Sequence, residues 1–155
     1  MTAENRSGDS NVNTVEQFMA TAVQTLSADD TLADALELME RYGCYHMPVV
    51  NEASELQGLV SHRDVLRAMP SSLVPDADEP DPTSVYVHHF MQRELITVKP
   101  DTGLKQAAMF IRNARIGCLP VVQDKKLLGI ITDTDFISIA VELFDQVGEI
   151  EPIAL

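Results

Sequence analysis

The chain has 155 residues, of which 24 are acidic and 11 are basic, giving a net charge of −13 at pH 7. Such acidity argues against nucleic acids and anionic membranes as partners, because both require a basic face on the protein. A chain of this length buries about two-thirds of the surface that is exposed when it is unfolded, which supports a core without disulfides or metal ions.

The N-terminal residues 1–13 are polar and lack the basic start and apolar run of a signal peptide, so we interpret them as a disordered leader. No stretch approaches the roughly 20 apolar residues of a membrane span. Cys44 and Cys118 lack CxxC spacing, which favours small buried apolar groups over a disulfide or a zinc site. These features together predict a cytoplasmic protein.

Most of the chain consists of two copies of one pattern, offset by 72 residues. After a turn that is one residue shorter in the second copy, the offset becomes 71. The matched residues include Phe18-Met19 with Phe90-Met91, Thr25 with Thr97, Pro48-Val49-Val50 with Pro120-Val121-Val122, and Gly58, Ser61 and Asp64 with Gly129, Thr132 and Asp135. Matches in constant register over this length indicate a duplicated structural unit.

The first copy is predicted to span residues 14–69. Its opening helix begins at Thr14, where the spacing to Gln17 is that of a capping box, and its second helix has apolar residues at i, i+3, i+4 and i+7 from Leu32. The elements in chain order are a short helix from 14 to 19, an extended segment at 24–26, a helix capped by Thr31, strands around 49–50 and 59–60, and a helix over about 62–69.

Residues 70–84 contain Pro75, Pro80, Pro82 and four acidic side chains, so we interpret them as a solvated linker. The second copy, residues 85–145, repeats the same elements. They are a short helix over 87–91, a helix with apolar residues at 104, 107, 108 and 111, strands around 121–122 and 130–131 joined by a tight hairpin at 123–126, and a last helix over about 133–144.

The last helix carries two apolar stripes, although packing against one core requires only one. The first stripe contains Ile137, Ala140, Val141 and Phe144, and the second contains Phe136, Ile139 and Leu143. We therefore expect a homodimer in which this helix and the C-terminal tail, residues 146–155, meet their mates across a twofold axis.

The duplicated elements predict an α+β fold of mixed α/β content, with two pseudo-symmetric β-α-β-β-α repeats packed through their small sheets. A unit of about 60 residues buries too little surface to be comfortably stable alone. The two copies are therefore expected to form one packed unit.

Each copy carries the pattern Gly-x-x-Ser/Thr-x-x-Asp where a strand leads into a helix. Backbone N–H groups and the helix dipole favour an anion at such a place, and Gly58 and Gly129 would allow close backbone approach. The spacing from Ser61 to Asp64, like that of its counterpart, is also the spacing of a helix-capping box. The two interpretations are compatible, and the motif alone leaves both open.

The segments Tyr45-His46-Met47-Pro48-Val49-Val50 and Gly117-Cys118-Leu119-Pro120-Val121-Val122, each followed by this motif, resemble the tandem CBS (cystathionine-β-synthase motif) domain pair, or Bateman module. The resemblance covers about residues 14–144. It implies adenosine ligands such as AMP, ADP, ATP or S-adenosylmethionine, held in clefts between the two copies. It implies neither an obligatory cofactor nor catalysis.

The resemblance also implies roles for individual residues. Ser61 and Thr132 would lie near ribose or phosphate, Asp64 and Asp135 would bind the ribose hydroxyls, and the segments before Pro48 and Pro120 would line the base. The predicted ligand-binding residues are Thr25, Tyr45, His46, Met47, Pro48, Gly58, Ser61, His62, Arg63, Asp64, Thr97, Gly117, Cys118, Leu119, Pro120, Gly129, Thr132, Asp133 and Asp135. The four histidines are assigned surface or packing roles, so no metal site is predicted.

The two predicted sites differ in charge. His62 and Arg63 stand between the Ser and Asp of the first motif, whereas Asp133 and Thr134 stand between the Thr and Asp of the second. A carboxylate repels a phosphate within a few Å, so we expect the first site to prefer phosphorylated ligands and the second to be weaker or to take less charged ones. The net charge should slow association with ATP, and magnesium on the nucleotide would offset this.

The leading functional hypothesis is a nucleotide sensor that acts in trans on an unidentified protein. The alternative is a structural dimerisation or adaptor module that binds no nucleotide and whose motifs are only helix caps. Ligand-dependent stability distinguishes the two. An enzyme is not expected, because the chain has no P-loop, GxGxxG or HExxH motif and no spacing that suggests a nucleophile and its base.

Overall fold

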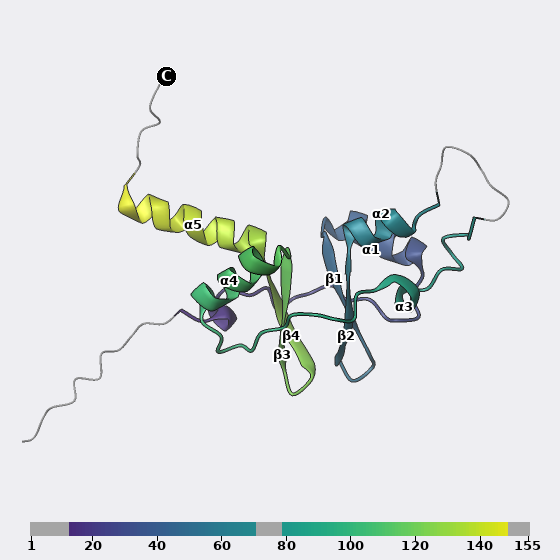
Figure 1. The fold of residues 1–155 in the computed structure, drawn as a ribbon, viewed down its shortest axis with the longest axis horizontal. Helices are drawn as coiled ribbons and strands as arrows, with labels where there is room; N and C mark the ends of the chain where they lie inside the picture. The colour runs from purple at the N-terminus through teal and green to yellow at the C-terminus, as the bar shows by residue number, and fades with distance from the viewer. Residues whose placement is uncertain (1–12, 71–78, 149–155) are drawn as a thin grey trace, which may run out of the picture.

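The computed structural model describes residues 13–70 and 79–148, and its elements follow the duplicated order (Figure 1). The first copy contributes η1 (Val15–Gln17), α1 (Leu32–Tyr42), β1 (His46–Val50), β2 (Leu56–Ser61) and α2 (His62–Ala68). The second contributes α3 (Val87–Phe90), α4 (Leu104–Ala114), β3 (Cys118–Gln123), β4 (Lys126–Thr132) and α5 (Asp133–Val147). Most of the predicted leader, residues 71–78 of the predicted linker and most of the tail lie outside the described residues.

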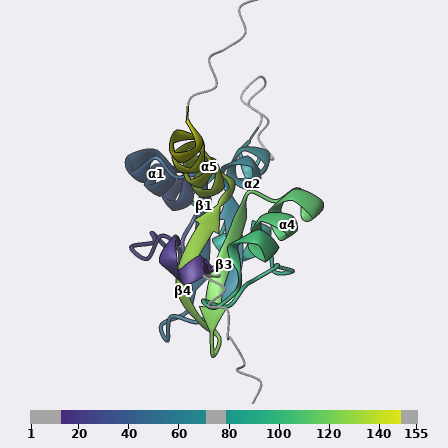
Figure 2. The ribbon, with the colours of Figure 1, turned by 90° about the vertical axis from the view of Figure 1, so that its left-hand side faces the viewer.

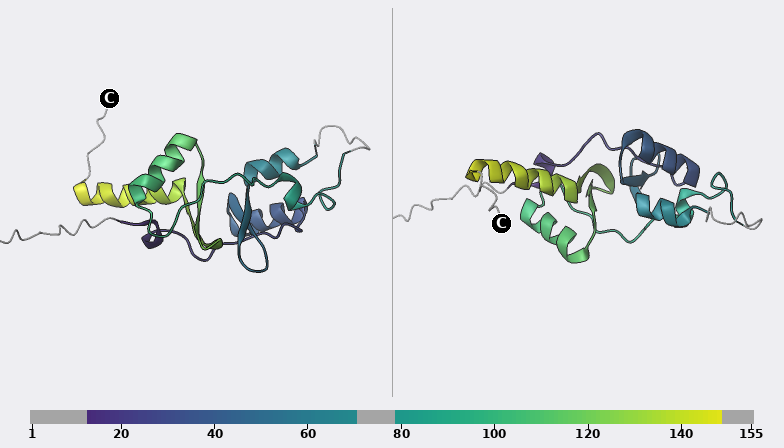
Figure 3. Two further views of the ribbon diagram at one scale, coloured as in Figure 1. Left: turned by 60° about the horizontal axis from the view of Figure 1, so that its bottom comes forward. Right: turned by 90° about the horizontal axis from the view of Figure 1, so that it is seen from above.

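Each copy contains a two-stranded antiparallel sheet with the same register in both. β1 pairs with β2 from His46 opposite Ser61, and β3 pairs with β4 from Cys118 opposite Thr132. The sheets lie in the middle of the molecule, with α1 and α2 at one end and α4 and α5 at the other (Figure 3). The predicted fold of two pseudo-symmetric mixed units is therefore confirmed.

α1 begins and ends as its sequence predicts. The Thr31 hydroxyl accepts a hydrogen bond from the Asp34 N–H at 3.2 Å, which satisfies one of the donors that a first turn leaves free. The predicted apolar stripe faces the core of the first copy. The helix ends at Gly43, whose φ of 62° is the left-handed conformation that glycine adopts most readily.

The short opening helices are exchanged between the two cores. Val15 of η1 is buried in the core of the second copy, and its N–H donates to the Thr102 carbonyl at 2.8 Å. Val87 of α3 is buried in the core of the first copy, and its N–H donates to the Asp30 carbonyl at 2.8 Å. Figure 2 shows η1, in purple, against the sheet of β3 and β4. Each core is thus completed by a helix from the other copy.

Gly58 and Gly129 allow the segments after these exchanged helices to approach the sheets closely. A Cβ atom at Gly129 would lie 2.5 Å from the carbonyl oxygen of Ala20, and one at Gly58 would lie 2.9 Å from that of Gln92. Both distances are far shorter than an ordinary carbon–oxygen contact. The space that each glycine leaves is therefore taken up by the protein backbone itself, at Ala20 beside Gly129 and at Gln92 beside Gly58.

α5 extends past the body of the second copy (Figure 1). It carries exposed apolar side chains. Phe136 packs against the second core, whereas Ile137 is 64% exposed and Phe144 is 70% exposed. One predicted stripe therefore begins against the core and the other faces outward. Among the described helices, none combines the length and the hydropathy that a membrane span requires.

Candidate functional site

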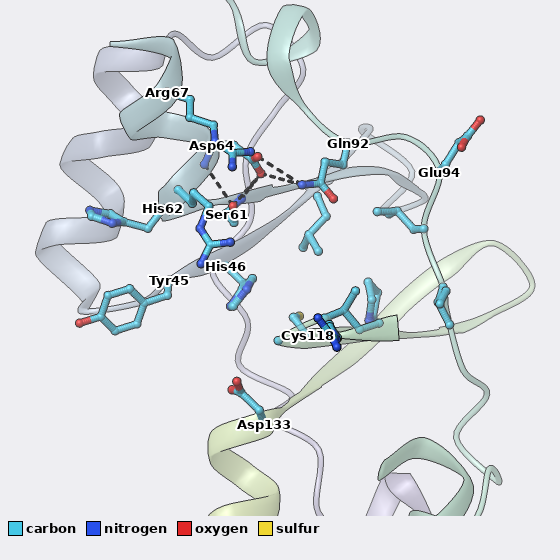
Figure 4. A pocket seen from close by; sticks show the side chains of 18 of the residues that line it. Tyr45, His46, Ser61, His62, Asp64, Arg67, Gln92, Glu94, Cys118 and Asp133 are labelled. Carbon is cyan, nitrogen blue, oxygen red and sulfur yellow. Dashed lines mark hydrogen bonds between the residues drawn. The ribbon is translucent and has the colours of Figure 1, made fainter. Parts of the chain in front are cut away.

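A cleft of about 860 Å³ opens between the two copies (Figure 4). The first copy supplies the end of β2 and the start of α2, and the second supplies residues 92–96, the loop before β3 and the start of α5. The lining residues are Tyr45, His46, Leu59, Ser61, His62, Arg63, Asp64, Leu66, Arg67, Gln92, Glu94, Leu95, Ile96, Arg115, Ile116, Gly117, Cys118, Pro120 and Asp133.

Ser61 and Asp64 cap α2 at one wall of the cleft. The Asp64 N–H donates to Ser61 Oγ at 3.1 Å, and the Ser61 N–H donates to Asp64 Oδ2 at 2.9 Å. Thr132 and Asp135 repeat this arrangement at the start of α5, with distances of 3.3 and 2.8 Å. The capping interpretation is therefore confirmed in both copies. In the first copy the cap uses Oδ2 of Asp64 and leaves Oδ1 outside it.

The second copy reaches the same carboxylate through Gln92. Its Nε2 donates to Asp64 Oδ1 and Oδ2 at 3.2 and 3.1 Å, as the dashed lines in Figure 4 show. The backbone of Gln92 is held by two hydrogen bonds with Leu59, both 2.9 Å long. At the repeat offset the counterpart of Gln92 is Ala20, which has no side-chain amide. This link between the copies therefore has no equivalent at Asp135.

Three arginines and three acidic residues line the cleft: Arg63, Arg67 and Arg115, and Asp64, Glu94 and Asp133. In a chain with a net charge of −13, equal numbers of the two signs make the cleft far less negative than the protein as a whole. Asp133, which the sequence placed at the second site, lies on this first cleft. Figure 4 shows it across the opening from Asp64.

The equivalent region around Asp135 lacks these cations. At the repeat offsets, Arg63, Arg67 and Arg115 correspond to Thr134, Ser138 and Gly43. His62 corresponds to Asp133, and both of these side chains line the Asp64 cleft. The difference between the two sides therefore rests on the three arginines, whose guanidinium groups would face an anionic ligand only on the Asp64 side.

His46 lies at the junction of the two copies, close to Gly117. A Cβ atom at Gly117 would lie 2.9 Å from Cε1 of His46, so glycine makes room for the imidazole. Burial lowers the pKa of His46, while the negative charges of Asp133 and Asp64 act in the opposite direction. At neutral pH this ring is therefore uncharged.

Cys118 forms part of the wall beneath His46. The side chain is buried, and this burial, with smaller effects from Asp135 and Asp133, raises the pKa of its thiol to about 12. The thiol is therefore protonated at neutral pH, which makes it a poor nucleophile. This agrees with its interpretation as a small buried apolar group.

The other histidines make local contacts. His88 Nδ1 lies 2.9 Å from the Ala28 carbonyl oxygen, and the His62 ring packs edge-on against Tyr45 with ring centroids 5.8 Å apart. Within residues 13–70 and 79–148, no group of three or more His, Cys, Asp or Glu side chains could hold a metal ion.

The structure brings about half of the sequence-predicted site residues to one cleft. They are Tyr45, His46, Ser61, His62, Arg63, Asp64, Gly117, Cys118, Pro120 and Asp133. The remaining predicted residues lie elsewhere: Thr25, Met47, Pro48, Gly58, Thr97, Leu119, Gly129, Thr132 and Asp135. Among these, Met47 and Leu119 are fully buried in the two cores, and Thr97 lines a separate pocket of about 390 Å³.

Sequence reasoning missed the lining residues that flank the motifs: Leu59, Leu66, Arg67, Gln92, Glu94, Leu95, Ile96, Arg115 and Ile116. A signal for two of them was present in the repeat. Gln92 and Arg115 are polar or charged where the first copy has Ala20 and Gly43. Positions at which two copies of one unit differ in this way are candidates for function.

Comparison with known proteins agrees with this architecture. The family model for the CBS domain matches residues 15–71 and 87–142. The fold is similar to that of a candidate acetoin utilization protein (AcuB) from Vibrio cholerae, with 38% identity, a TM-score of 0.75 and coverage of 91% of this chain and 99% of that one. It is also similar to CBSX2 in complex with AMP, with 26% identity, a TM-score of 0.71 and coverage of 84% and 97%.

A third similarity is to part of a longer enzyme. The homoserine O-acetyltransferase of Methanosalsum zhilinae is 27% identical over 119 residues, which are 76% of this chain but 22% of the enzyme. A sequence of this kind is therefore also found as a minor part of a larger protein.

Proposed function

Because this chain belongs to the CBS domain family, we propose that it is a regulatory module that binds an adenosine ligand between its two copies. The observation that carries this proposal is the cleft of about 860 Å³, whose walls combine the Asp64 carboxylate, apolar side chains and three arginines. Pockets for small ligands typically measure about 300–1,000 Å³ and combine an apolar lining with a few placed polar groups.

Each part of an adenosine ligand has a matching surface in this cleft. Leu59, Ile96 and Pro120 provide an apolar wall for the base. The Asp64 carboxylate accepts hydrogen bonds from the ribose hydroxyls, because ionised carboxylates are strong acceptors. The arginines donate to phosphate oxygens.

Charge favours phosphorylated ligands at this site. Arg63, Arg67 and Arg115 provide guanidinium groups, which bind phosphate in a bidentate manner. AMP, ADP and ATP are therefore favoured over S-adenosylmethionine. Magnesium on a triphosphate would reduce its repulsion from Asp133 and Glu94. The complex of the similar protein CBSX2 with AMP supports this ligand class.

The Thr132/Asp135 side is proposed to be the weaker site. It keeps the capping carboxylate but has Thr134, Ser138 and Gly43 in place of the three arginines. A phosphate there would gain no charge-assisted hydrogen bond from these positions. Less charged adenosine ligands are its expected occupants.

The module is proposed to act on a protein in trans or as part of an assembly. A ligand that binds one packing of the two copies better than another shifts the population between them, and a partner that contacts the module can sense the shift. The similarity to a segment of a longer enzyme supports a regulatory role. The outward stripe of α5, with Ile137 and Phe144, supports self-association as a homodimer.

A second candidate is a structural dimerisation module that binds no nucleotide. Two observations favour it: Asp64 and Asp135 both serve as complete helix caps, and α5 exposes an apolar face. Both observations are also compatible with ligand binding. The two candidates differ in whether a ligand stabilises the fold.

Thermal unfolding with AMP, ADP, ATP with and without magnesium, and S-adenosylmethionine tests the choice. A ligand at 100 times its Kd adds about 2.7 kcal/mol of stability, which raises Tm by several degrees for a chain of this size. The variant Asp64→Asn is the control, since the rise in Tm that a ligand causes should largely disappear in it. No shift with any ligand favours the structural module, and turnover of a nucleotide by the purified protein would contradict a purely regulatory role.

A further inference from the structure

We propose that Gln92 competes with the ribose of the ligand for the Asp64 carboxylate and thereby sets the affinity of the cleft. This inference rests on the proposed function, because it assigns a role to a residue within the same site. It follows from the geometry of one side-chain amide and from the difference between the two copies.

The Gln92 amide lies where a ribose diol would bind. Its Nε2 is 3.2 Å from Oδ1 and 3.1 Å from Oδ2 of Asp64, so one nitrogen faces both oxygens of the carboxylate. Two neighbouring hydroxyls that donate one hydrogen bond to each oxygen must approach along the same open edge of the carboxylate. The amide and the diol therefore exclude each other.

The helix cap occupies part of the same carboxylate. Oδ2 accepts from the Ser61 N–H at 2.9 Å and from Ser61 Oγ at 2.7 Å, in addition to Gln92. The cap therefore takes two of the roughly four acceptor positions of the carboxylate, and the Gln92 amide faces the edge that remains. A ribose can use the remaining positions only when the amide leaves.

The amide can leave without disturbing the fold. The backbone of Gln92 is fixed to Leu59 by two 2.9 Å hydrogen bonds, but the side chain is exposed and can rotate into solvent. Ligand binding then exchanges a contact between the two copies for a contact with the ligand. Because Ala20 occupies the equivalent position, only the Asp64 site carries this competitor.

Calorimetric titration of Gln92→Ala with AMP and ATP, each beside its 2′-deoxy analogue, tests the inference. Removing one competing hydrogen bond to an ionised group should lower Kd for AMP and ATP by about three- to tenfold. The gain should be smaller for the 2′-deoxy ligands, which have one hydroxyl fewer to place on Asp64. The matched control is Gln57→Ala, which removes another exposed glutamine that does not line the cleft and should leave Kd unchanged.

Failure of this inference is distinct from failure of the proposed function. If the unaltered protein binds AMP or ATP and Gln92→Ala binds them equally or more weakly, the inference is overturned, and weaker binding would mean that Gln92 contacts the ligand directly. If neither protein binds any adenosine ligand, the proposed function fails and the inference falls with it. Binding by the variant alone would support both.

Discussion

Arg115 and Gly43 occupy equivalent positions at the ends of α4 and α1, and both have a left-handed backbone, with φ of 53° and 62°. This conformation costs a residue with a Cβ atom about 1 kcal/mol, which glycine avoids. The second copy thus has an arginine where the fold favours glycine. Since Arg115 lines the cleft, the strain coincides with the candidate site, as backbone strain often does.

We therefore expect Arg115→Gly to stabilise the protein while weakening its binding of phosphorylated ligands. Relief of the strain should add about 1 kcal/mol, or about 3 °C in Tm. Loss of a charge-assisted hydrogen bond should raise Kd for AMP or ATP by about tenfold. Thermal unfolding without ligand and calorimetric titration measure the two effects. The control Gly43→Ala should lose stability but keep its affinity, and an unchanged affinity in Arg115→Gly would contradict the role in phosphate binding.

Substitution of the two capping aspartates should distinguish an effect on stability from an effect on ligand binding. Asp64→Asn and Asp135→Asn remove equivalent charges from equivalent helix caps, so each should cost a similar stability of about 0.5–1 kcal/mol. Only Asp64→Asn should weaken AMP or ATP binding strongly, by about 10- to 100-fold, because a hydrogen bond to a charged group is lost. Denaturant unfolding and calorimetry compare the pair. Equal losses of affinity in both variants would contradict the proposed difference between the sites.

The two repeat glycines should differ in how much they tolerate a methyl group. In Gly129→Ala the new Cβ would lie 2.5 Å from the Ala20 carbonyl oxygen, which the backbone holds in place. In Gly58→Ala the shortest contact, 2.7 Å, is with the flexible sulfur of Met91, and the backbone oxygen is 2.9 Å away. We expect Gly129→Ala to lose about 2–3 kcal/mol in urea unfolding and Gly58→Ala to lose less. If Gly58→Ala lost more stability than Gly129→Ala, the backbone at Ala20 would have to shift more easily than the backbone at Gln92.

The repeat made most of the fold predictable. Capping residues such as Thr31 and apolar periodicity located the helices, and β-branched pairs located the strands. The exchange of the opening helices could not be predicted, because Val15 and Val87 carry the same apolar pattern and would fit either core. That choice depends on how the two copies pack, which no local pattern encodes.

The packing of the two copies also explains why some residues of the cleft could not be predicted from the sequence. The Gly-x-x-Ser-x-x-Asp motif identified one wall, but the facing residues, Gln92 and Arg115, come from the other copy. The link from Gln92 to Asp64 joins residues 28 positions apart, and only the packed structure brings them together. Predicted residues such as Met47 and Leu119 were displaced from the cleft because they alternate with cleft-facing neighbours along a strand and point into the cores.

His46 should make part of the stability depend on pH. Burial lowers the pKa of His46 in the folded protein below the ordinary value of 6.5. As the pH falls, His46 is therefore protonated at a higher pH in the unfolded chain than in the folded protein. The stability that His46 contributes is therefore complete above about pH 6.5 and is lost as the pH falls through the folded pKa. His46→Gln should lose less stability than the unaltered protein between pH 7 and pH 5 in urea unfolding. The exposed His89, changed to Gln as a control, should follow the unaltered protein, and parallel curves for all three would contradict the argument.

The outward face of α5 should hold two copies of the chain together. Ile137, Val141, Phe144 and Val147 are 64%, 53%, 70% and 81% exposed and recur along one side of the helix. Such a stripe loses its contact with water when it packs against the same stripe of a second copy across a twofold axis. We expect sedimentation to find a dimer at tens of micromolar.

A charge in this stripe should dissociate the dimer without unfolding the protein. Ile137→Asp and Phe144→Asp each place a carboxylate in the contact, where two copies of it would face each other without a partner. Ser138→Asp adds the same charge to an exposed neighbouring position and should remain a dimer. Thermal unfolding establishes that each variant is folded. Because the cleft lies within one chain, the monomeric variants should keep their AMP affinity, and its loss would mean that the second copy helps to form the site.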